Sequence, residues 1–485
     1  MKRRFFSVLL CCLLLAGCEI NYPVPSLPES DESRPSHLET QPDSASDGSD
    51  PDETSSGGST AASLSNTANS TGVTEEVPSN STNPYTTRPS SAVSSDASEP
   101  SSAPDPSTPT VKPPDDTDTE FRGVWVSYIE LNSMFKNKTT AQAKQSIDGM
   151  MDNCLSFGMN AVIFHVRANS DAYYQSKLFQ PAASVTSLLN SGFDPLSYAV
   201  QAAHARGLEL HAWVNPYRIG RNLSYRVSSY KGEPIPYFKD KADSPGYWYA
   251  PTSLAAQGLI LAGIQELLAY DIDGIQFDDY FYPAGVLSAT SPADFEKADY
   301  EAAGGRMNIG NWRRTHVDAL ISSVYNKAHT KPGCVFGVSP SHDFVKTREQ
   351  GYADTVKWLQ KAGYVDYLCP QIYFGFEHQT SKFDQCLEEW LAFKPDSSVK
   401  LYIGLGIYKI GLSPDNWAGS GKLEWAKNDD IMKRSVELLR RKKTGGMMFY
   451  SYTYFIPASV SAPSGQTYDR NVAKREVANL LPLLQ

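Results

Sequence analysis

Short apolar runs alternate with helix-length segments from residue 121 almost to the end of the 485-residue chain. The short runs predict eight strands, over residues 121–127, 161–167, 208–215, 274–280, 335–340, 367–373, 401–406 and 446–452. The longer segments predict helices over residues 141–157, 195–205, 253–270, 312–330, 354–361, 383–393, 429–441 and 470–484. Strand alternating with helix is typical of parallel β-structure. Eight such pairs predict an α/β fold, a closed (β/α)8 TIM barrel over residues 119–485.

The connections between these elements differ in length according to their direction. The four long ones each follow a strand and precede a helix, over residues 216–252, 281–311, 407–428 and 453–469. In a (β/α)8 barrel all such connections emerge on the C-terminal face, where active sites lie. The long insertions therefore predict a substrate cleft on that face.

Alternation within the strands separates a polar side from an apolar one. Successive side chains of a strand point to opposite faces, and the apolar side must pack on the helices. The polar side should then face the barrel interior near its open C-terminal end. This reasoning selects His165 and Arg167, His211 and Asn215, Gln276, Asp278 and Tyr280, and Gln371 with Tyr373.

The N-terminus indicates export. Three basic residues precede an apolar run over 5–15, which is too short to span a bilayer comfortably. The run ends in Leu15-Ala16-Gly17-Cys18, which resembles a bacterial lipobox. Residues 1–18 are therefore predicted to be a lipoprotein signal peptide, with lipid on Cys18 anchoring the mature protein outside the cell membrane. An ordinary secretory signal is the alternative.

Residues 19–118 consist mostly of Ser, Thr, Pro, Asp and Glu, with almost no apolar clusters. Their eighteen acidic and three basic residues give a net charge of −15. The signal contributes +3, so residues 119–485 carry about +2 of the total of −10. So polar a segment cannot bury enough apolar surface to fold, and it is predicted to be a disordered linker. The near-neutral barrel gives no indication of nucleic-acid binding.

Four cysteines remain in the predicted barrel, Cys154, Cys334, Cys369 and Cys386. They are widely spaced and form no Cys-x-x-Cys pair, so the spacing does not support a zinc site. Buried free thiols are favoured over a disulfide, which stays possible in an exported protein. We expect no metal and no cofactor.

Five motifs carry a family resemblance, and they are "RGVWVS", "AWVNPYR", "DGIQFDDYFYP", "PQIYFGF" and "IGLGIYKIG". In this order they cover nearly all of residues 121–455, and they resemble glycosyl hydrolase-like family 10. That family, formerly a domain of unknown function, is common on bacterial lipoproteins. The resemblance implies a (β/α)8 barrel and glycoside hydrolysis, with members linked to peptidoglycan glycan strands.

The motif over Asp273–Pro283 also resembles the fourth strand of two other barrel groups. Asp278 matches the last aspartate of the α-amylase pattern D-G-F-R-L-D, which is the nucleophile there. In the chitinase pattern D-G-x-D-x-D-x-E, Asp278 matches the last aspartate, whereas Gln276 and Tyr280 replace the first catalytic aspartate and the glutamate. These departures argue against a plain chitinase mechanism.

Glycoside hydrolysis normally needs two carboxyl groups. Asp278 and Asp279 are the predicted catalytic pair, and Asp171, Asp343 and Glu377 are the other candidates for the second acid. Sugar rings stack on aromatic side chains, while amides and guanidinium groups bind their polar substituents. The predicted substrate-binding residues are His165, Arg167, His211, Asn215, Tyr217, Arg218, Gln276, Tyr280, Tyr282, Gln371 and Tyr373.

Two functions from different classes follow. The first is a glycoside hydrolase acting on a cell-envelope or extracellular polysaccharide that contains N-acetylhexosamine, such as peptidoglycan glycan strands. The second is a non-catalytic, lipid-anchored carbohydrate-binding protein, which the missing glutamate favours. In either case the partners would be a polysaccharide and, through Cys18, the membrane, and a monomer is expected.

Overall fold

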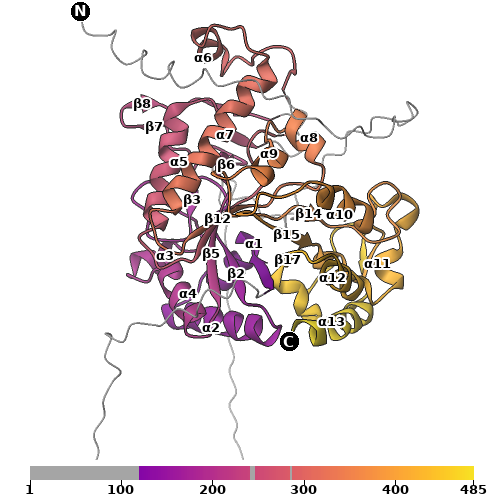
Figure 1. Ribbon diagram of the computed structural model, residues 1–485. Coiled ribbons are helices and arrows are strands. Elements are labelled where there is room, and N and C mark those ends of the chain that lie inside the picture. Colours follow the sequence, from indigo (N-terminus) through magenta and orange to yellow (C-terminus); the bar gives the residue numbers. More distant parts are fainter. Residues whose placement is uncertain (1–119, 241–245, 284–286) are drawn as a thin grey trace, which may run out of the picture. The chain divides into compact units, whose positions relative to one another are not determined.

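The computed structural model describes residues 120–240, 246–283 and 287–485. These residues form a closed barrel of eight parallel strands, as predicted (Figure 1). In barrel order the strands are β1 (Phe121–Val126), β2 (Ala161–Arg167), β5 (Glu209–Val214), β11 (Gly274–Phe277), β12 (Val335–Val338), β13 (Tyr367–Leu368) with β14 (Gln371–Ile372), β15 (Lys400–Leu405) and β17 (Gly446–Tyr450). The barrel closes because β1 pairs with both β2 and β17. The predicted lipobox at Cys18 and linker over 19–118 lie outside the described residues.

The sixth strand is divided into β13 and β14 by Pro370, which has no N–H to donate. Its neighbours keep the barrel closed at this point. The N–H of Cys369 donates to the carbonyl of Val338, and the N–H of Gln371 donates to that of Pro340, both across 2.9 Å. Gln371 is thereby fixed at the C-terminal end of the barrel.

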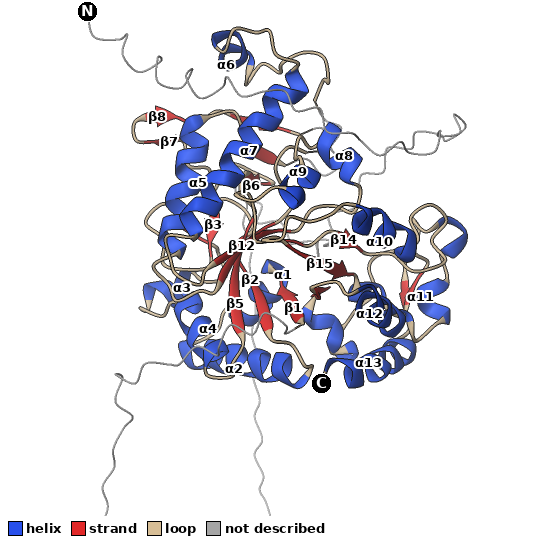
Figure 2. Ribbon diagram, in the orientation of Figure 1, coloured by secondary structure: helices blue, strands red, loops and turns tan. Residues whose placement is uncertain are grey.

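Helices surround the barrel, as Figure 2 shows. The predicted ones are α2 (Thr140–Ser156), α4 (Pro195–His204), α5 (Leu254–Leu267), α7 (Ile309–Ala328), α9 (Thr355–Gln360), α10 (Phe383–Ala392), α12 (Ile431–Lys442) and α13 (Arg470–Leu484). Several of these helices begin at a residue whose side chain caps the first turn. Asp194 accepts from the N–H groups of Leu196 and Ser197 at the start of α4, with Pro195 in the first turn.

The remaining elements all lie in strand-to-helix connections. The helices among them are α1 (Tyr128–Phe135), α3 (Thr186–Asn190), α6 (Lys297–Ala302), α8 (Phe344–Glu349), α11 (Glu424–Lys427) and the 3-10 turns η1 (Ile407–Lys409), η2 (Gly419–Gly421), η3 (Tyr452–Phe455) and η4 (Pro457–Ser459). The short strands are β3 (Asp171–Ala172), β4 (Gln180–Pro181), β6 (Arg218–Gly220), β7 (Ser229–Tyr230), β8 (Glu233–Pro234), β9 (Tyr237–Lys239), β10 (Tyr247–Tyr249), β16 (Leu412–Ser413) and β18 (Thr467–Tyr468). The inserted residues thus build the C-terminal face.

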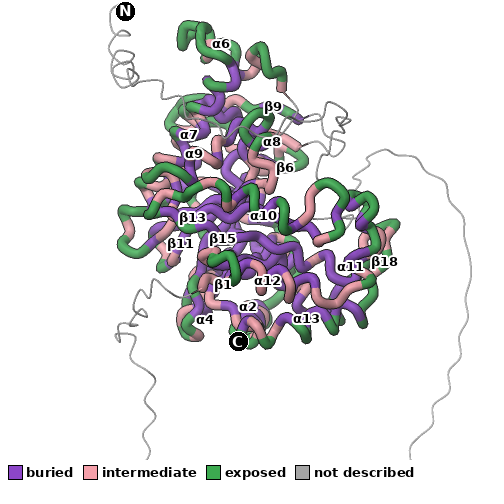
Figure 3. The backbone as a smooth tube through the Cα atoms, turned by 45° about the vertical axis from the view of Figure 1, so that its right-hand side comes forward, coloured by how far each residue is buried: buried purple, intermediate pink, exposed green. Residues whose placement is uncertain are grey.

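Two apolar layers hold the barrel, and its strands are largely buried (Figure 3). The larger layer lies between strands and helices and contains Val162 and Phe164 of β2. The smaller layer fills the interior with Trp125, Ile163, Trp213, Tyr367, Cys369, Tyr373, Met448 and Tyr450. Alternate residues of β2 therefore face opposite sides, as predicted.

Cys154, Cys334, Cys369 and Cys386 are buried free thiols, as expected. None of the helices in the described ranges has the length and apolar character needed to cross a membrane.

Candidate active site

His211 and Gln276 lie inside the barrel but below its open end. Both ring nitrogens of His211 are engaged, Nδ1 with the Tyr367 hydroxyl at 3.0 Å and Nε2 with Glu209 at 3.1 Å. His211 is the register partner of Gly274, the first residue of β11, which places it toward the N-terminal end. Its side chain therefore fills the interior of the barrel near the N-terminal end, away from the face that carries the insertions.

Gln276 occupies the layer above His211 and uses both ends of its amide. Its Oε1 accepts a hydrogen bond from Nε1 of Trp125 at 2.5 Å, and its Nε2 donates to the Tyr367 hydroxyl at 3.3 Å. The same Nε2 lies 3.2 Å from Sδ of Met448. This buried amide therefore holds the indole of Trp125 in place.

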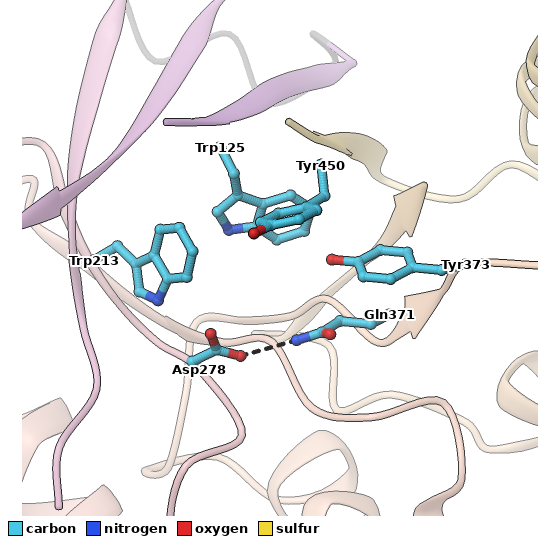
Figure 4. Close-up of a pocket in the computed structure, with 6 residues that line it drawn as sticks. All are labelled: Trp125, Trp213, Asp278, Gln371, Tyr373 and Tyr450. Atoms are coloured by element: carbon cyan, nitrogen blue, oxygen red, sulfur yellow. Dashed lines mark hydrogen bonds between the residues drawn. The ribbon is translucent and has the colours of Figure 1, made fainter. Parts of the chain in front are cut away.

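A pocket opens above these layers (Figure 4). It is partly open to solvent and is lined by Trp125, Trp213, Asp278, Gln371, Tyr373 and Tyr450. Figure 4 shows the four aromatic side chains around the space beside Asp278 and Gln371. Aromatic walls with one carboxyl and one amide are suited to a sugar ring, which has apolar faces and polar edges.

Asp278 is the carboxyl group of this pocket, and it is 8% exposed. Its Oδ1 accepts hydrogen bonds from Nε2 of Gln371 and from the N–H of Asp279, both at 2.9 Å. Burial raises the pKa of Asp278 above its ordinary value, against the lowering effect of these hydrogen bonds and of the Arg218 charge. Asp278 therefore takes up a proton more readily than an exposed aspartate.

Trp125 and Tyr450 form one side of the pocket and are register partners on the neighbouring strands β1 and β17. Their ring centroids lie 6.2 Å apart, and Tyr450 also stacks on Tyr373 at 5.9 Å. Neither Trp125 nor Tyr450 could be selected by alternation, because their strands are apolar on both sides. The signal that could have found them is the large aromatic residue near the end of each strand.

Glu130 braces the two strand ends that carry these aromatic residues. Its Oε2 accepts from the N–H of Ser127 at 2.6 Å, just beyond β1. Its Oε1 accepts from the Ser451 hydroxyl at 2.7 Å and from the N–H of Thr453 at 2.9 Å, just beyond β17. A single buried carboxylate thus joins the connections that follow Trp125 and Tyr450.

His165 and Trp213 stack against each other, with ring centroids 3.5 Å apart. Nδ1 of His165 accepts a hydrogen bond from the N–H of Tyr128 at 3.4 Å. Burial lowers the pKa of His165 well below its ordinary value, and the Arg218 charge lowers it further, so the imidazole is neutral. Nε1 of Trp213 is buried and has no hydrogen-bond partner among the described residues, which leaves a donor for a ligand in the pocket wall.

The prediction from alternation is wrong for Arg167. A β-bulge between His165 and Arg167 shifts the register, so Arg167 pairs with Val214 of the outer layer. Its guanidinium lies over Phe179 at 4.3 Å and donates to the carbonyl of Pro216 at 3.0 Å. The structure does not bring Arg167 to the pocket.

Arg218 is the first residue of β6, and its positive charge acts on two carboxyl groups, those of Asp278 and Asp171. Its guanidinium lies 5.0 Å from the ring centroid of Tyr280, and its charge lowers the pKa of both Asp278 and Asp171. Burial outweighs that effect at Asp171 and raises its pKa to about 6. Asp171 is therefore a second carboxyl near Arg218 that can hold a proton close to neutral pH.

Three other predicted residues pack the third and fourth connections. Tyr217 and Tyr282 are buried, and Tyr282 donates from its hydroxyl to Glu296 at 3.3 Å. Asn215 is buried and donates from Nδ2 to the carbonyl of Ala168 at 2.9 Å. None of the three is among the pocket's lining residues.

The remaining candidate acids differ in their surroundings. Asp343 caps α8 by accepting from the N–H of Lys346 at 2.7 Å, which is a structural role. Glu377 is exposed in the connection after β14. Asp279 follows Asp278 directly and is half-buried. Within the described ranges, no group of three or more His, Cys, Asp or Glu side chains could hold a metal ion.

Comparison with known proteins gives one family match. A family model described as glycosyl hydrolase-like 10 matches residues 120–418. Glycosyl hydrolase YngK of Bacillus subtilis (strain 168) is 32% identical over 320 residues, which are 61% of this chain and 62% of YngK, less than two thirds of its length. Glycosyl hydrolase DigH of Escherichia coli (strain K12) is 29% identical over 365 residues, which are 66% of this chain and 82% of DigH.

Among solved structures, the chain is similar to the PgaB (BpsB) glycoside hydrolase domain from Bordetella bronchiseptica. The sequence identity is 12% and the TM-score is 0.45, and the match covers 70% of this chain and 97% of that domain.

Proposed function

Because the chain belongs to the glycosyl hydrolase-like 10 family, we propose that it hydrolyses glycosidic bonds in a cell-envelope polysaccharide, with Asp278 as a catalytic carboxyl group. The observation that carries the proposal is a buried carboxyl group of raised pKa among four aromatic side chains. An acid in such surroundings can protonate the oxygen of a leaving sugar. The aromatic walls would hold the ring in contact with it.

Asp279 and Asp171 are the candidates for the second carboxyl group. Asp279 is the next residue, and its N–H already donates to Asp278. Asp171 shares the Arg218 charge with Asp278 and has a pKa of about 6. To divide the roles of acid and base, one of the two carboxyl groups must hold a proton while the other is ionised.

We propose a glycan that contains N-acetylhexosamine as the substrate, with peptidoglycan glycan strands as the first choice. The unpartnered indole N–H of Trp213 offers a hydrogen bond to a carbonyl oxygen such as that of an acetamido group. Lipid on Cys18 would hold the enzyme at the outer side of the cell membrane, where such a glycan lies. YngK and DigH, to which the chain is similar, are both named glycosyl hydrolases.

Release of reducing ends tests this proposal. The purified chain is incubated with peptidoglycan glycan strands, both with and without their stem peptides, and with chitin-type oligosaccharides. We expect new reducing ends from at least one of these substrates, and none from the same reaction with Asp278→Asn. A parent protein that binds the glycans but releases no reducing ends would contradict hydrolysis.

That last outcome would support the second candidate function, a carbohydrate-binding protein without catalysis. The observation in its favour is that Asp278 is the single carboxyl group among the six lining residues. In addition, Tyr280 stands where the chitinase pattern has its glutamate. The same reducing-end measurement therefore separates the two functions.

A further inference from the structure

Trp417 differs from the other tryptophans of the chain. All eight lie in the described ranges, and seven of them are at most 6% exposed, whereas Trp417 is 46% exposed. It lies between β16 and η2, in the long connection that follows β15. That connection emerges on the C-terminal face of the barrel, as the pocket does.

The backbone around Trp417 is fixed by a buried ion pair. Asp415 accepts from Nζ of Lys409 at 2.9 Å, and both side chains are at most 8% exposed. The other oxygen of Asp415 accepts from the N–H of Trp417 at 3.4 Å. The N–H of Asp415 in turn donates to the carbonyl of Lys422 at 2.8 Å, which closes the turn around Trp417.

Residues of the connection that follows β14 also form hydrogen bonds with the turn around Trp417. The N–H of Gln379 donates to the carbonyl of Ala418 at 3.1 Å, and Oε1 of Gln379 accepts from the N–H of Ser420 at 3.2 Å. The two connections approach so closely that a Cβ on Gly421 would lie 2.2 Å from the carbonyl oxygen of Glu377. Trp417 is thus presented by a rigid backbone.

The connection that carries Trp417 also forms part of the wall behind the pocket. Tyr408, in η1, lies 5.8 Å from Tyr373 and 5.9 Å from Tyr450, measured between ring centroids. The next residue is Lys409, whose ion pair with Asp415 fixes the turn around Trp417. A continuous set of contacts therefore connects Trp417 to the two tyrosines of the pocket.

We propose that Trp417 is a remote sugar-binding platform, which stacks on the apolar face of a pyranose ring several units away from the bond cleaved in the pocket. This inference rests on the proposed function, because it requires a glycan chain in the pocket. Single exposed apolar residues are common on protein surfaces. Because the backbone that carries Trp417 is fixed, only the two rotations of its side chain remain to be ordered when a ring stacks on the indole, which favours binding.

The test compares the full-length parent with Trp417→Ala, Trp417→Tyr and the control Leu423→Ala, which removes another half-exposed apolar side chain of the same connection. Two quantities are measured, the Kd for insoluble glycan by sedimentation and kcat/KM for long strands and for short oligosaccharides. We expect Trp417→Ala to bind and cleave long glycan about tenfold less well, equivalent to about 1.4 kcal/mol. It should cleave short oligosaccharides at the parental rate, while Trp417→Tyr and Leu423→Ala stay close to the parent.

Parental binding and cleavage of long glycan by Trp417→Ala would overturn the platform, as would an equal loss on short oligosaccharides. A parent that binds glycan without cleaving it would refute the proposed hydrolysis. The sedimentation measurement would then still decide the role of Trp417. A parent that binds no glycan would overturn both proposals. An unchanged melting temperature in Trp417→Ala would exclude misfolding as the cause of a loss.

Discussion

Gln371 donates a hydrogen bond from its side-chain amide to Oδ1 of Asp278 across 2.9 Å and so connects the ends of β14 and β11. The same Nε2 donates to the carbonyl of Ser339 at 3.0 Å, after β12, so the amide is oriented by the barrel itself. If the Gln371 amide were turned over, so that its oxygen took the place of Nε2, the hydrogen bonds to Asp278 and to Ser339 would both be lost. This arrangement favours the ionised form of Asp278 and limits how far burial raises the pKa of that group.

Replacement of Gln371 by Leu should raise the pKa of Asp278 further. The substitution removes a hydrogen bond that lowers this pKa and leaves burial, which raises it, in place. The limb of the pH profile of kcat/KM that reports Asp278 should therefore move to higher pH, whether the group acts as an acid or as a base. Gln201→Leu, on the exposed surface of α4, is the matched control. A limb that stays in place or moves to lower pH would contradict the coupling.

Glu130→Gln should destabilise the barrel. The carboxylate accepts three hydrogen bonds, and a glutamine would turn an N–H₂ group toward at least one of these donors. We expect the free energy of unfolding to fall by about 2–3 kcal/mol, measured by urea denaturation. The exposed Glu301→Gln should change it by less than about 0.5 kcal/mol. Equal stability of the two variants would show that Glu130 does not brace β1 against β17.

The main elements could be predicted from the sequence because their apolar pattern is strong. β2 and α13 have the predicted bounds, and the other strands and main helices differ by a few residues at their ends. The short elements of the insertions were missed because long-range contacts form them. The helix α6 buries none of its own residues and follows Glu296, which is held by the buried side chain of Arg313.

The pocket could be predicted only in part. Alternation identified Asp278, Gln371 and Tyr373, because a polar residue is conspicuous in an apolar strand. It could not give the depth along the barrel axis, so it grouped His211, near the N-terminal end, with residues of the pocket. It also could not anticipate the bulge that turns Arg167 outward, since a bulge leaves no mark in the apolar pattern.

Cys18→Ala should move the protein from the membrane fraction to the soluble extracytoplasmic fraction. The basic residues, the apolar run and the lipobox indicate lipid on Cys18, and loss of that lipid should release the protein from the bilayer. Fractionation followed by immunoblotting measures the change. Cys11→Ala, within the apolar run, is the control and should leave the protein in the membrane fraction. Firm membrane binding by the Cys18 variant would rule out lipid as the main tether.

Asp278→Asn should lower kcat/KM by several orders of magnitude, where each factor of ten corresponds to about 1.4 kcal/mol of transition-state stabilisation. Asparagine keeps the size of the side chain and an oxygen that can accept from Gln371 and from the N–H of Asp279. It can neither deliver a proton nor carry a negative charge. Asp279→Asn, assayed in parallel, shows whether the neighbouring carboxyl group is the catalytic partner. Near-parental cleavage by a folded Asp278→Asn protein would remove Asp278 from the mechanism and leave Asp279 and Asp171 as the candidates.

The stability of Asp278→Asn should depend on pH in a defined direction. The pKa of Asp278 is raised in the folded state, so its protonated form stabilises the fold at low pH. That contribution is complete below the unfolded-state pKa and is lost as the pH rises through the higher folded-state pKa. Asparagine does not titrate, and therefore the melting temperature of Asp278→Asn should match the parent in acid and exceed it increasingly toward neutral pH. A variant that becomes less stable than the parent as the pH rises would show that the ionised carboxylate stabilises the fold, and would contradict a raised pKa.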